Sequence, residues 1–215
     1  MPEMKLRRPI TSTDLYRKRF NVLDFKDEWL QLIGRPEVTG SWIIYGDSAH
    51  GKTRFMIQMA KYLGQFGRVF INSLEEGEAE SIRQVWQQED IDTSRDHVYL
   101  LDKEPVNMVR QRLEARNAPD IVFFDSVQFM RKFSEDDYVD LLNDFGNKLF
   151  IFTSHAEGKK AKGAVAEAIR YRSFVKIMVE GYRAFSKSRY GGSGYYDVWP
   201  EMAEKYWAER LKSSK

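Results

Sequence analysis

The 215-residue sequence contains no cysteine. This absence excludes disulfides, thiolate metal sites and cysteine nucleophiles. The three histidines, His50, His97 and His155, do not have the spacing of a metal site. Long apolar runs are missing too: none reaches the roughly 18 residues of a membrane span, and the start of the chain lacks the apolar region of a signal peptide. We therefore expect a cytoplasmic protein with no membrane partner.

The composition is that of a globular protein, with 42% hydrophobic and 31% charged residues. The net charge is only +2, but it is unevenly distributed. Residues 75–92 hold seven acidic residues and one Arg, whereas residues 155–190 hold nine Lys or Arg and three Glu. Polyanion binding would belong to the second region, and an ordinary solvated face is an equally good explanation of the bias.

Short apolar runs alternate with amphipathic stretches through most of the chain. The runs predict strands at 42–45, 68–73, 97–101, 121–125 and 148–153, with helices at 53–63, 78–88 and 104–116. Such alternation predicts a parallel sheet covered by helices on both faces. Three short alternating segments at 173–180, 182–188 and 195–199 predict antiparallel strands that extend this sheet.

The pattern divides the chain into three parts. Residues 1–37 form a basic arm that ends in a docking helix, residues 38–199 form the core, and residues 200–215 form a C-terminal helix. The basic residues of the arm are Arg7, Arg8, Arg17, Lys18 and Arg19, and the apolar face of its helix is Phe25, Trp29, Leu30 and Ile33.

The segment GDSAHGKT follows a predicted strand and precedes a predicted helix, which is the context of a phosphate-binding P-loop. In such a loop, backbone N–H groups surround the phosphates of ATP, Lys52 reaches the β- and γ-phosphates, and Thr53 ligates Mg²⁺. The expected nucleotide-binding residues are Gly46, Asp47, Ser48, Ala49, His50, Gly51, Lys52, Thr53 and Arg54.

Two carboxylates lie at the ends of predicted strands. Asp125 follows four apolar residues, as expected for a second Mg²⁺ ligand. Glu75 follows the strand at 68–73, where it could polarise the attacking water. Alternatively, Glu75 or Glu76 begins the next helix, where an acid suits the helix dipole. Position alone leaves both interpretations open.

The segments GDSAHGKT, INSLEEG, IVFFDSVQ, FTSHAEG and KSRYGG together resemble, in order and spacing, the RecA-like ATPase core of DnaB-type replicative helicases and RadA-type recombination ATPases. The resemblance implies a RecA-like α/β fold and assigns Glu75 as the catalytic base. It places Gln128 near the γ-phosphate or the DNA-facing loop. His155 becomes a γ-phosphate sensor, with a simple strand cap as the alternative.

The resemblance also implies an assembly. Lys187 and Arg189 match a pair that these families insert into the site of a neighbouring subunit, where an arginine stabilises the transition state. A ring, such as a hexamer, or a filament follows. The corresponding DNA-facing loop would hold Lys159, Lys160, Lys162 and Arg170, and it could instead contact a protein.

The sequence therefore predicts an oligomeric, Mg²⁺-dependent ATPase that acts on single-stranded DNA, with a replication or recombination protein as a further partner. One alternative is an ATP-dependent assembly switch that binds no nucleic acid. A less favoured one is a P-loop kinase of small molecules.

Overall fold

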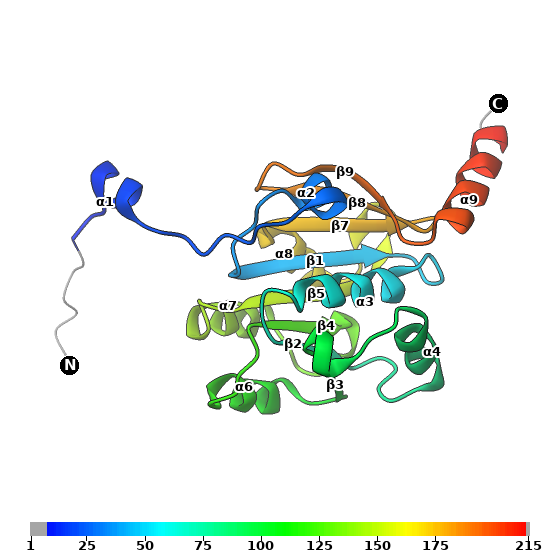
Figure 1. Ribbon diagram of the computed structural model, residues 1–215. Helices are drawn as coiled ribbons and strands as arrows, with labels where there is room; N and C mark the ends of the chain where they lie inside the picture. Colours follow the sequence, from blue (N-terminus) through cyan, green and yellow to red (C-terminus); the bar gives the residue numbers. More distant parts are fainter. Residues whose placement is uncertain (1–7, 214–215) are drawn as a thin grey trace.

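The computed structural model describes residues 8–213, and within them a nine-stranded sheet forms the centre of the molecule (Figure 1). The strands are β1 (Gly40–Gly46), β2 (Val69–Ser73), β3 (Val98–Asp102), β4 (Ile121–Asp125), β5 (Leu149–Glu157), β6 (Lys160–Ala161), β7 (Val175–Glu180), β8 (Arg183–Ser188) and β9 (Ser193–Asp197). The helices are α1 (Ser12–Arg17), α2 (Asp27–Ile33), α3 (Lys52–Leu63), α4 (Glu80–Gln88), α5 (Thr93–Asp96), α6 (Val106–Glu114), the 3₁₀ turn η1 (Val127–Phe129), α7 (Glu135–Asp144), α8 (Ala164–Arg172) and α9 (Pro200–Ser213).

The strand order is β3-β2-β4-β5-β1-β7-β8-β9, with β6 paired to β5. Strands β3, β2, β4, β5, β1 and β7 are parallel, and β8 and β9 continue the sheet in antiparallel fashion. The mainly parallel sheet with antiparallel strands from the last third is confirmed. The antiparallel part begins one strand later than expected, because β7 pairs in parallel with β1.

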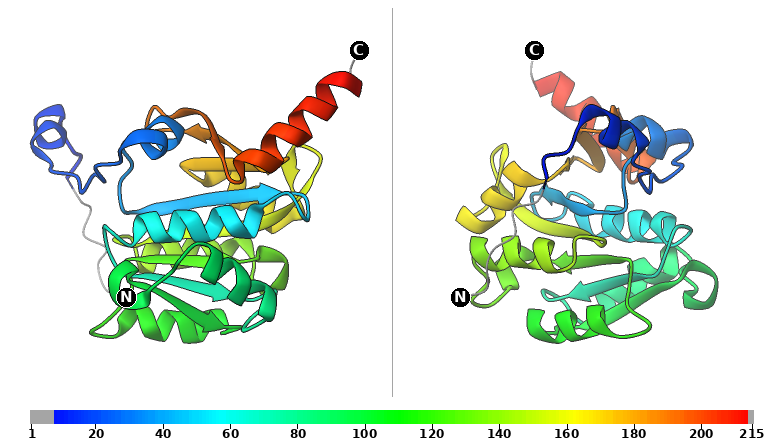
Figure 2. Two further views of the ribbon diagram at one scale, coloured as in Figure 1. Left: turned by 45° about the vertical axis from the view of Figure 1, so that its right-hand side comes forward. Right: turned by 90° about the vertical axis from the view of Figure 1, so that its left-hand side faces the viewer.

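The strands are buried on both faces, as their continuous apolar runs require. On β1, Trp42 and Ile44 face a core shared with α2 and α3, whereas Ile43 and Tyr45 face a core shared with α6, α7 and α8. Figure 2 shows α3 and α7 on opposite sides of the sheet. No helix within residues 8–213 is long and apolar enough to span a bilayer.

The N-terminal segment contains a detached helix and a docked one. Helix α1 buries no residue and lies away from the sheet (Figure 1). Helix α2 buries Leu32 and Ile33, and Trp29 stacks on Tyr62 and Tyr196 with ring centroids 5.0 and 4.9 Å apart. Of the predicted arm and C-terminal helix, residues 1–7, including Arg7, and residues 214–215 lie outside the described part of the chain.

The prediction of a basic loop between His155 and Ser173 is wrong. Strand β5 continues to Glu157, β6 turns back against it, and α8 occupies Ala164–Arg172. Helix α7 was not predicted either. The apolar periodicity of α8 is weak, whereas that of α7 is comparable to the periodicity of α3 and α6. Helix α7 begins with a capping box between Ser134 and Asp137.

Candidate nucleotide site

The sheet brings most of the predicted site residues together at the carboxyl ends of its parallel strands. In the register of the strands, Gly46 at the end of β1 pairs with His155 of β5, and Ser73 at the end of β2 pairs with Asp125 of β4. The carboxyl ends of neighbouring parallel strands form the crevice in which ligands bind in open α/β sheets. Glu75 follows β2 at the same ends of the strands.

The phosphate loop has a conformation that requires glycine at two positions. A Cβ on Gly46 would lie 2.2 Å from the carbonyl oxygen of Val179, so no side chain fits there. Gly51 caps α3 with φ of 91°, which favours glycine. Lys52, the first residue of α3, is only 8% exposed. The loop therefore presents the lysine and the helix N-terminus to a bound anion.

His50 fastens this loop to the turn between β7 and β8. Its carbonyl oxygen accepts a hydrogen bond from the N–H of Tyr182 at 3.1 Å, and its Nδ1 accepts one from the N–H of Gly181 at 3.2 Å. His50 therefore holds the phosphate loop against the β7–β8 turn, a structural role that the sequence pattern does not indicate.

Asp125 is buried, with 3% of its surface exposed, and its Oδ1 accepts a hydrogen bond from the hydroxyl of Thr153. Burial raises the pKa of Asp125 to about 6, the Thr153 hydrogen bond opposes this shift, and the negative charge of Glu75 adds to it. Lys52 is close enough to favour the charged form. A divalent cation bound beside Asp125 would favour the charged form of its carboxylate, as Lys52 does.

The two neighbouring glutamates have different surroundings. The carboxylate of Glu75 accepts a hydrogen bond from the Ser126 hydroxyl at 3.2 Å, and its Oε2 lies 3.5 Å from Nε2 of His155. Its backbone N–H donates to the carbonyl of Asp125 at 2.9 Å. Glu76 instead accepts a hydrogen bond from Ser81 on α4. Only Glu75 therefore points toward the strand ends.

Gln128, on η1, links two segments of the site. Its Nε2 donates to the hydroxyl of Ser154 at 2.9 Å and to the carbonyl of Lys162 at 2.8 Å, and its Oε1 accepts from the backbone N–H of His155 at 3.2 Å. It lies between the end of β5 and the connection from β6 to α8. The sequence interpretation does not name the hydroxyl residues Ser126, Thr153 and Ser154, although Ser126 follows Asp125 and Ser154 precedes His155.

Oxygen donors that suit Mg²⁺ are present. The ion takes one or two protein oxygens and completes its octahedron with phosphates and waters. The hydroxyl of Thr53 on the first turn of α3 and the carboxylate of Asp125 fit this requirement. Among residues 8–213 there is no group of three or more His, Asp or Glu that would indicate a metal cage made by protein alone.

Lys187 and Arg189 lie near the opposite ends of the strands, beside the start of β1. Ser188 pairs with Val175, and Val175 pairs with Trp42 near the start of β1, whereas the P-loop follows the end of that strand. The guanidinium of Arg189 lies 4.9 Å from the ring centroid of Phe174. The structure therefore does not bring the pair together with the other site residues of the same chain.

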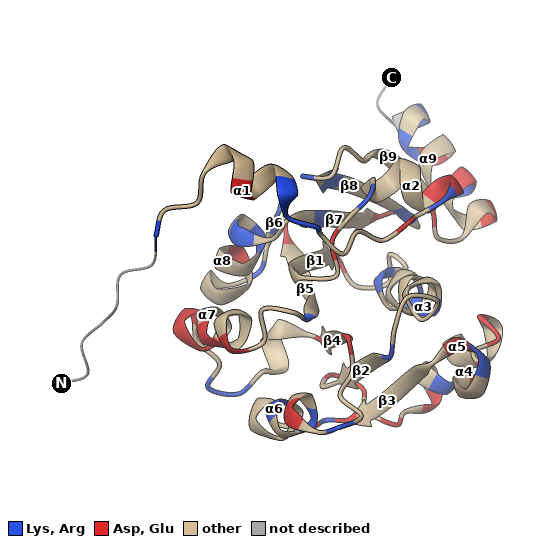
Figure 3. Cartoon of the chain, turned by 60° about the vertical axis from the view of Figure 1, so that its left-hand side comes forward, with Lys and Arg blue, Asp and Glu red and all other residues tan. Residues whose placement is uncertain are grey.

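Basic residues lie on α8 and near β6 (Figure 3), and their surroundings differ. Lys159, Lys160 and Lys162, on and beside the β5–β6 hairpin, are exposed. Arg170 is on helix α8, where it forms an ion pair with Glu167 at 2.6 Å and lies 5.9 Å from the ring centroid of Tyr45. Its guanidinium is thus engaged within the fold, unlike the three lysines.

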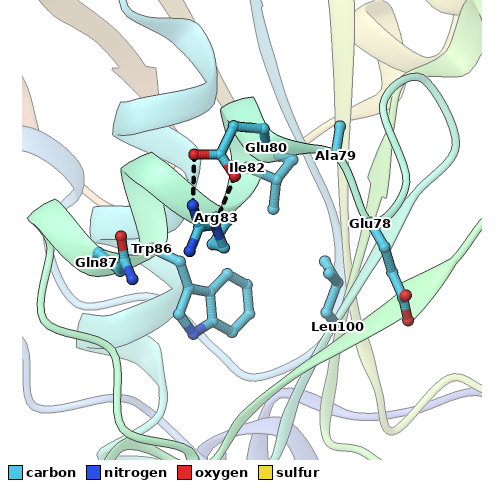
Figure 4. A pocket seen from close by; sticks show the side chains of 8 residues that line it. All are labelled: Glu78, Ala79, Glu80, Ile82, Arg83, Trp86, Gln87 and Leu100. Carbon is cyan, nitrogen blue, oxygen red and sulfur yellow. Dashed lines mark hydrogen bonds and ion pairs between the residues drawn. The ribbon is translucent and has the colours of Figure 1, made fainter.

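Two surface pockets lie beyond the P-loop. One, of about 620 Å³, borders Glu75 and is also lined by Lys103, Phe129 and Arg131. The other, of about 430 Å³, lies between α4 and β3 around Ile82, Trp86 and Leu100 (Figure 4). No P-loop residue lines either pocket, so neither is the phosphate site itself.

Comparisons of the whole chain give structural relatives only. No family model matches the sequence, and no curated protein matches it. The structure is similar to flagellar accessory protein FlaH from Methanocaldococcus jannaschii, with 18% identity, a TM-score of 0.57, and coverage of 81% of this chain and 91% of that one. The chain has the RecA-like ATPase fold.

Two further structures share this RecA-like fold. A KaiC-like protein from Pyrococcus horikoshii matches with 17% identity and a TM-score of 0.56, covering 79% of this chain and 89% of that one. The ATPase domain of G40P matches with 14% identity and a TM-score of 0.54, covering 77% and 83%. At these identities the matches show the RecA-like fold alone, and they confirm the fold resemblance drawn from the motifs.

Proposed function

We propose that the protein is a Mg²⁺-dependent ATPase that works as an oligomer and binds single-stranded DNA. One observation carries the ATPase assignment: at the edge where the P-loop lies, one carboxylate is buried and another is half-exposed and held by hydrogen-bonding groups. Asp125 is 3% exposed, whereas the side chain of Glu75 is 32% exposed beside Ser126 and His155. The pair matches the separate needs of metal binding and of water activation.

In this mechanism the backbone of the P-loop and Lys52 bind the phosphates. Thr53 and Asp125 would hold Mg²⁺, which when bound neutralises charge on the β- and γ-phosphates. Glu75 accepts the proton of the attacking water, because its carboxylate is oriented by Ser126 and His155. We assign His155 as the γ-phosphate sensor; its side chain contacts Glu75 and its backbone N–H donates to Gln128, which supports this role.

The oligomer is part of the proposal because the basic pair that the family resemblance assigns to the nucleotide site does not lie there in its own chain. Lys187 and Arg189 lie near the opposite ends of the strands from the P-loop, so they would act in the site of a neighbouring subunit. Their use in trans generates a ring, such as a hexamer, or a filament, according to the rotation between subunits. The core of this assembly is residues 38–199, with residues 1–37 as an arm and 200–215 as a terminal helix.

DNA binding is assigned to the exposed lysines of the β5–β6 hairpin, Lys159, Lys160 and Lys162. Three cations on a short hairpin suit contact with phosphates irrespective of base sequence. The Gln128 side chain bonds both to the Lys162 carbonyl and to His155. A hydrogen-bonded route therefore joins the hairpin to the γ-phosphate end of the nucleotide site.

ATP hydrolysis measured with Mg²⁺ or with EDTA, and with or without single-stranded DNA at low salt, tests the proposal. We expect Mg²⁺-dependent turnover that DNA stimulates. Hydrolysis without stimulation, together with no DNA binding, would contradict the DNA assignment. Nucleotide-dependent assembly without hydrolysis would favour the switch, and phosphoryl transfer to an added small acceptor would favour a kinase.

A further inference from the structure

Aromatic residues gather beside the P-loop on the side away from Asp125. In the sheet, β4 and β5 lie on one side of β1, and β7 and β8 lie on the other. The turn between β7 and β8 carries Tyr182, whose backbone has φ of 60°. A Cβ on Gly51 would lie 3.3 Å from Cδ1 of Tyr182, so this ring borders the phosphate loop directly.

Trp199, which immediately precedes α9, extends this aromatic group. Its ring meets the ring of Tyr182 edge to face, with centroids 6.2 Å apart and an interplanar angle of 79°. The guanidinium carbon of Arg54 lies 4.7 Å from the Trp199 ring centroid. Arg54 follows Thr53 in the sequence, so the indole lies beside the first turn of α3.

Trp199 is held in place and yet accessible. Arg54 forms an ion pair with Glu89 at 2.5 Å, and Gln58 donates to the same carboxylate at 3.2 Å. This network fixes the guanidinium that lies over the indole. Trp199 nevertheless remains 40% exposed, although it contacts the ring of Tyr182 and the guanidinium of Arg54.

The two sides of the P-loop suggest the direction of a bound nucleotide. Asp125, Glu75 and His155 lie on the β4–β5 side, so the γ-phosphate faces that way. The nucleoside then leaves the loop on the β7–β8 side, where Tyr182 and Trp199 lie. We propose that the exposed part of the Trp199 ring stacks on the base of the bound nucleotide, with the guanidinium of Arg54 supporting the indole.

This assignment rests on the proposed nucleotide binding and adds how the base is selected. Stacking recognises the π face of a base and tolerates different hydrogen-bonding edges. Purine triphosphates therefore bind more tightly than pyrimidine triphosphates, and ATP and GTP differ little. Trp199 sets affinity through the base and makes no contribution to phosphate binding.

The experiment compares two ligands, a non-hydrolysable ATP analogue and inorganic tripolyphosphate, each with Mg²⁺, by calorimetry. The proteins are the full chain, Trp199→Ala, Trp199→Phe and the control Tyr195→Ala, which removes another exposed ring, on β9. We expect Trp199→Ala to weaken the ATP analogue about tenfold or more, in line with the loss of one base stack. Tripolyphosphate binding should change less than about twofold, and Trp199→Phe and Tyr195→Ala should stay near the wild type.

The outcomes separate this proposal from the one on which it rests. If the wild type binds neither ligand, nucleotide binding itself fails. If the wild type binds the ATP analogue and Trp199→Ala binds it equally well, or loses affinity for both ligands alike, only the base platform is overturned. Should Trp199→Ala misfold, the Phe variant still decides: quenching of tryptophan fluorescence by the ATP analogue must be lost in Trp199→Phe, and retained quenching contradicts the stack.

Discussion

Nε2 of His155, on β5, lies 3.5 Å from Oε2 of Glu75, which follows β2. The contact depends on the order of the sheet, in which β4 separates β2 from β5. The backbone N–H of the same histidine donates to Gln128. The side chain proposed as the base is therefore coupled to the segment that leads to the exposed lysines.

Glu75→Gln should abolish turnover and leave ATP binding intact. Glutamine keeps the shape of the side chain and cannot accept the proton of the attacking water, so we expect a loss of about 10²-fold or more in kcat. The matched control is Glu76→Gln, because Glu76 faces Ser81 on α4. Steady-state hydrolysis and nucleotide calorimetry check the pair, and equal loss in both variants would remove Glu75 from its role.

Asp125→Asn should stabilise the protein without ligand and abolish its stabilisation by Mg²⁺ and ATP. Burial raises the pKa of Asp125 to about 6, above its unfolded value, so the folded state holds the proton more tightly. The free energy of unfolding therefore falls as the pH rises from about 4 to above about 6. Asparagine avoids that loss and can still accept the hydrogen bond of Thr153.

The shift of about two pKa units sets an upper limit of about 3 kcal/mol for this gain. Urea unfolding at pH 8 should show the variant more stable by about 1–3 kcal/mol, with the difference shrinking toward pH 4. A variant that is less stable than the wild type at pH 8, or one that still gains stability from Mg²⁺ and ATP, would contradict the assignment.

Arg189→Ala should lose turnover and recover part of it when mixed with Lys52→Ala. In a mixed oligomer, an intact nucleotide site of one variant meets an intact Arg189 of the other. Arg116→Ala, an exposed arginine after α6, serves as the control and should be active alone. Hydrolysis measured across mixing ratios tests this, and the absence of rescue at every ratio would exclude action in trans.

Replacing Lys159, Lys160 and Lys162 together by alanine should weaken DNA binding and flatten its salt dependence. Each phosphate contact on a single strand contributes about 0.7 to the slope of log K against log salt, so the slope should fall by about 2. The control is Lys205→Ala with Lys212→Ala on α9. Fluorescence anisotropy over a salt series gives both slopes, and an unchanged slope in the triple variant would place the DNA elsewhere.

The positions of the P-loop, Asp125 and Glu75 could be predicted because each follows a short apolar strand. In a parallel sheet, that local pattern is enough to place all three at one edge. Helix α8 could not be predicted, because its apolar periodicity is weaker than that of α3, α4 and α6. The contacts of Trp199 with Arg54 and of Thr153 with Asp125 depend on packing between distant segments, which no local pattern records.

Strand β8 connects two places that belong to different nucleotides in the proposed assembly. Its first end follows Tyr182, which is hydrogen-bonded to the phosphate loop through His50, and its last residue precedes Arg189. A hydrogen-bonded strand resists stretching along its length. A pull on Arg189 by the nucleotide of one subunit would therefore reach the phosphate loop of the subunit that supplies the arginine. In the proposed assembly, this coupling would let the subunits hydrolyse ATP in sequence.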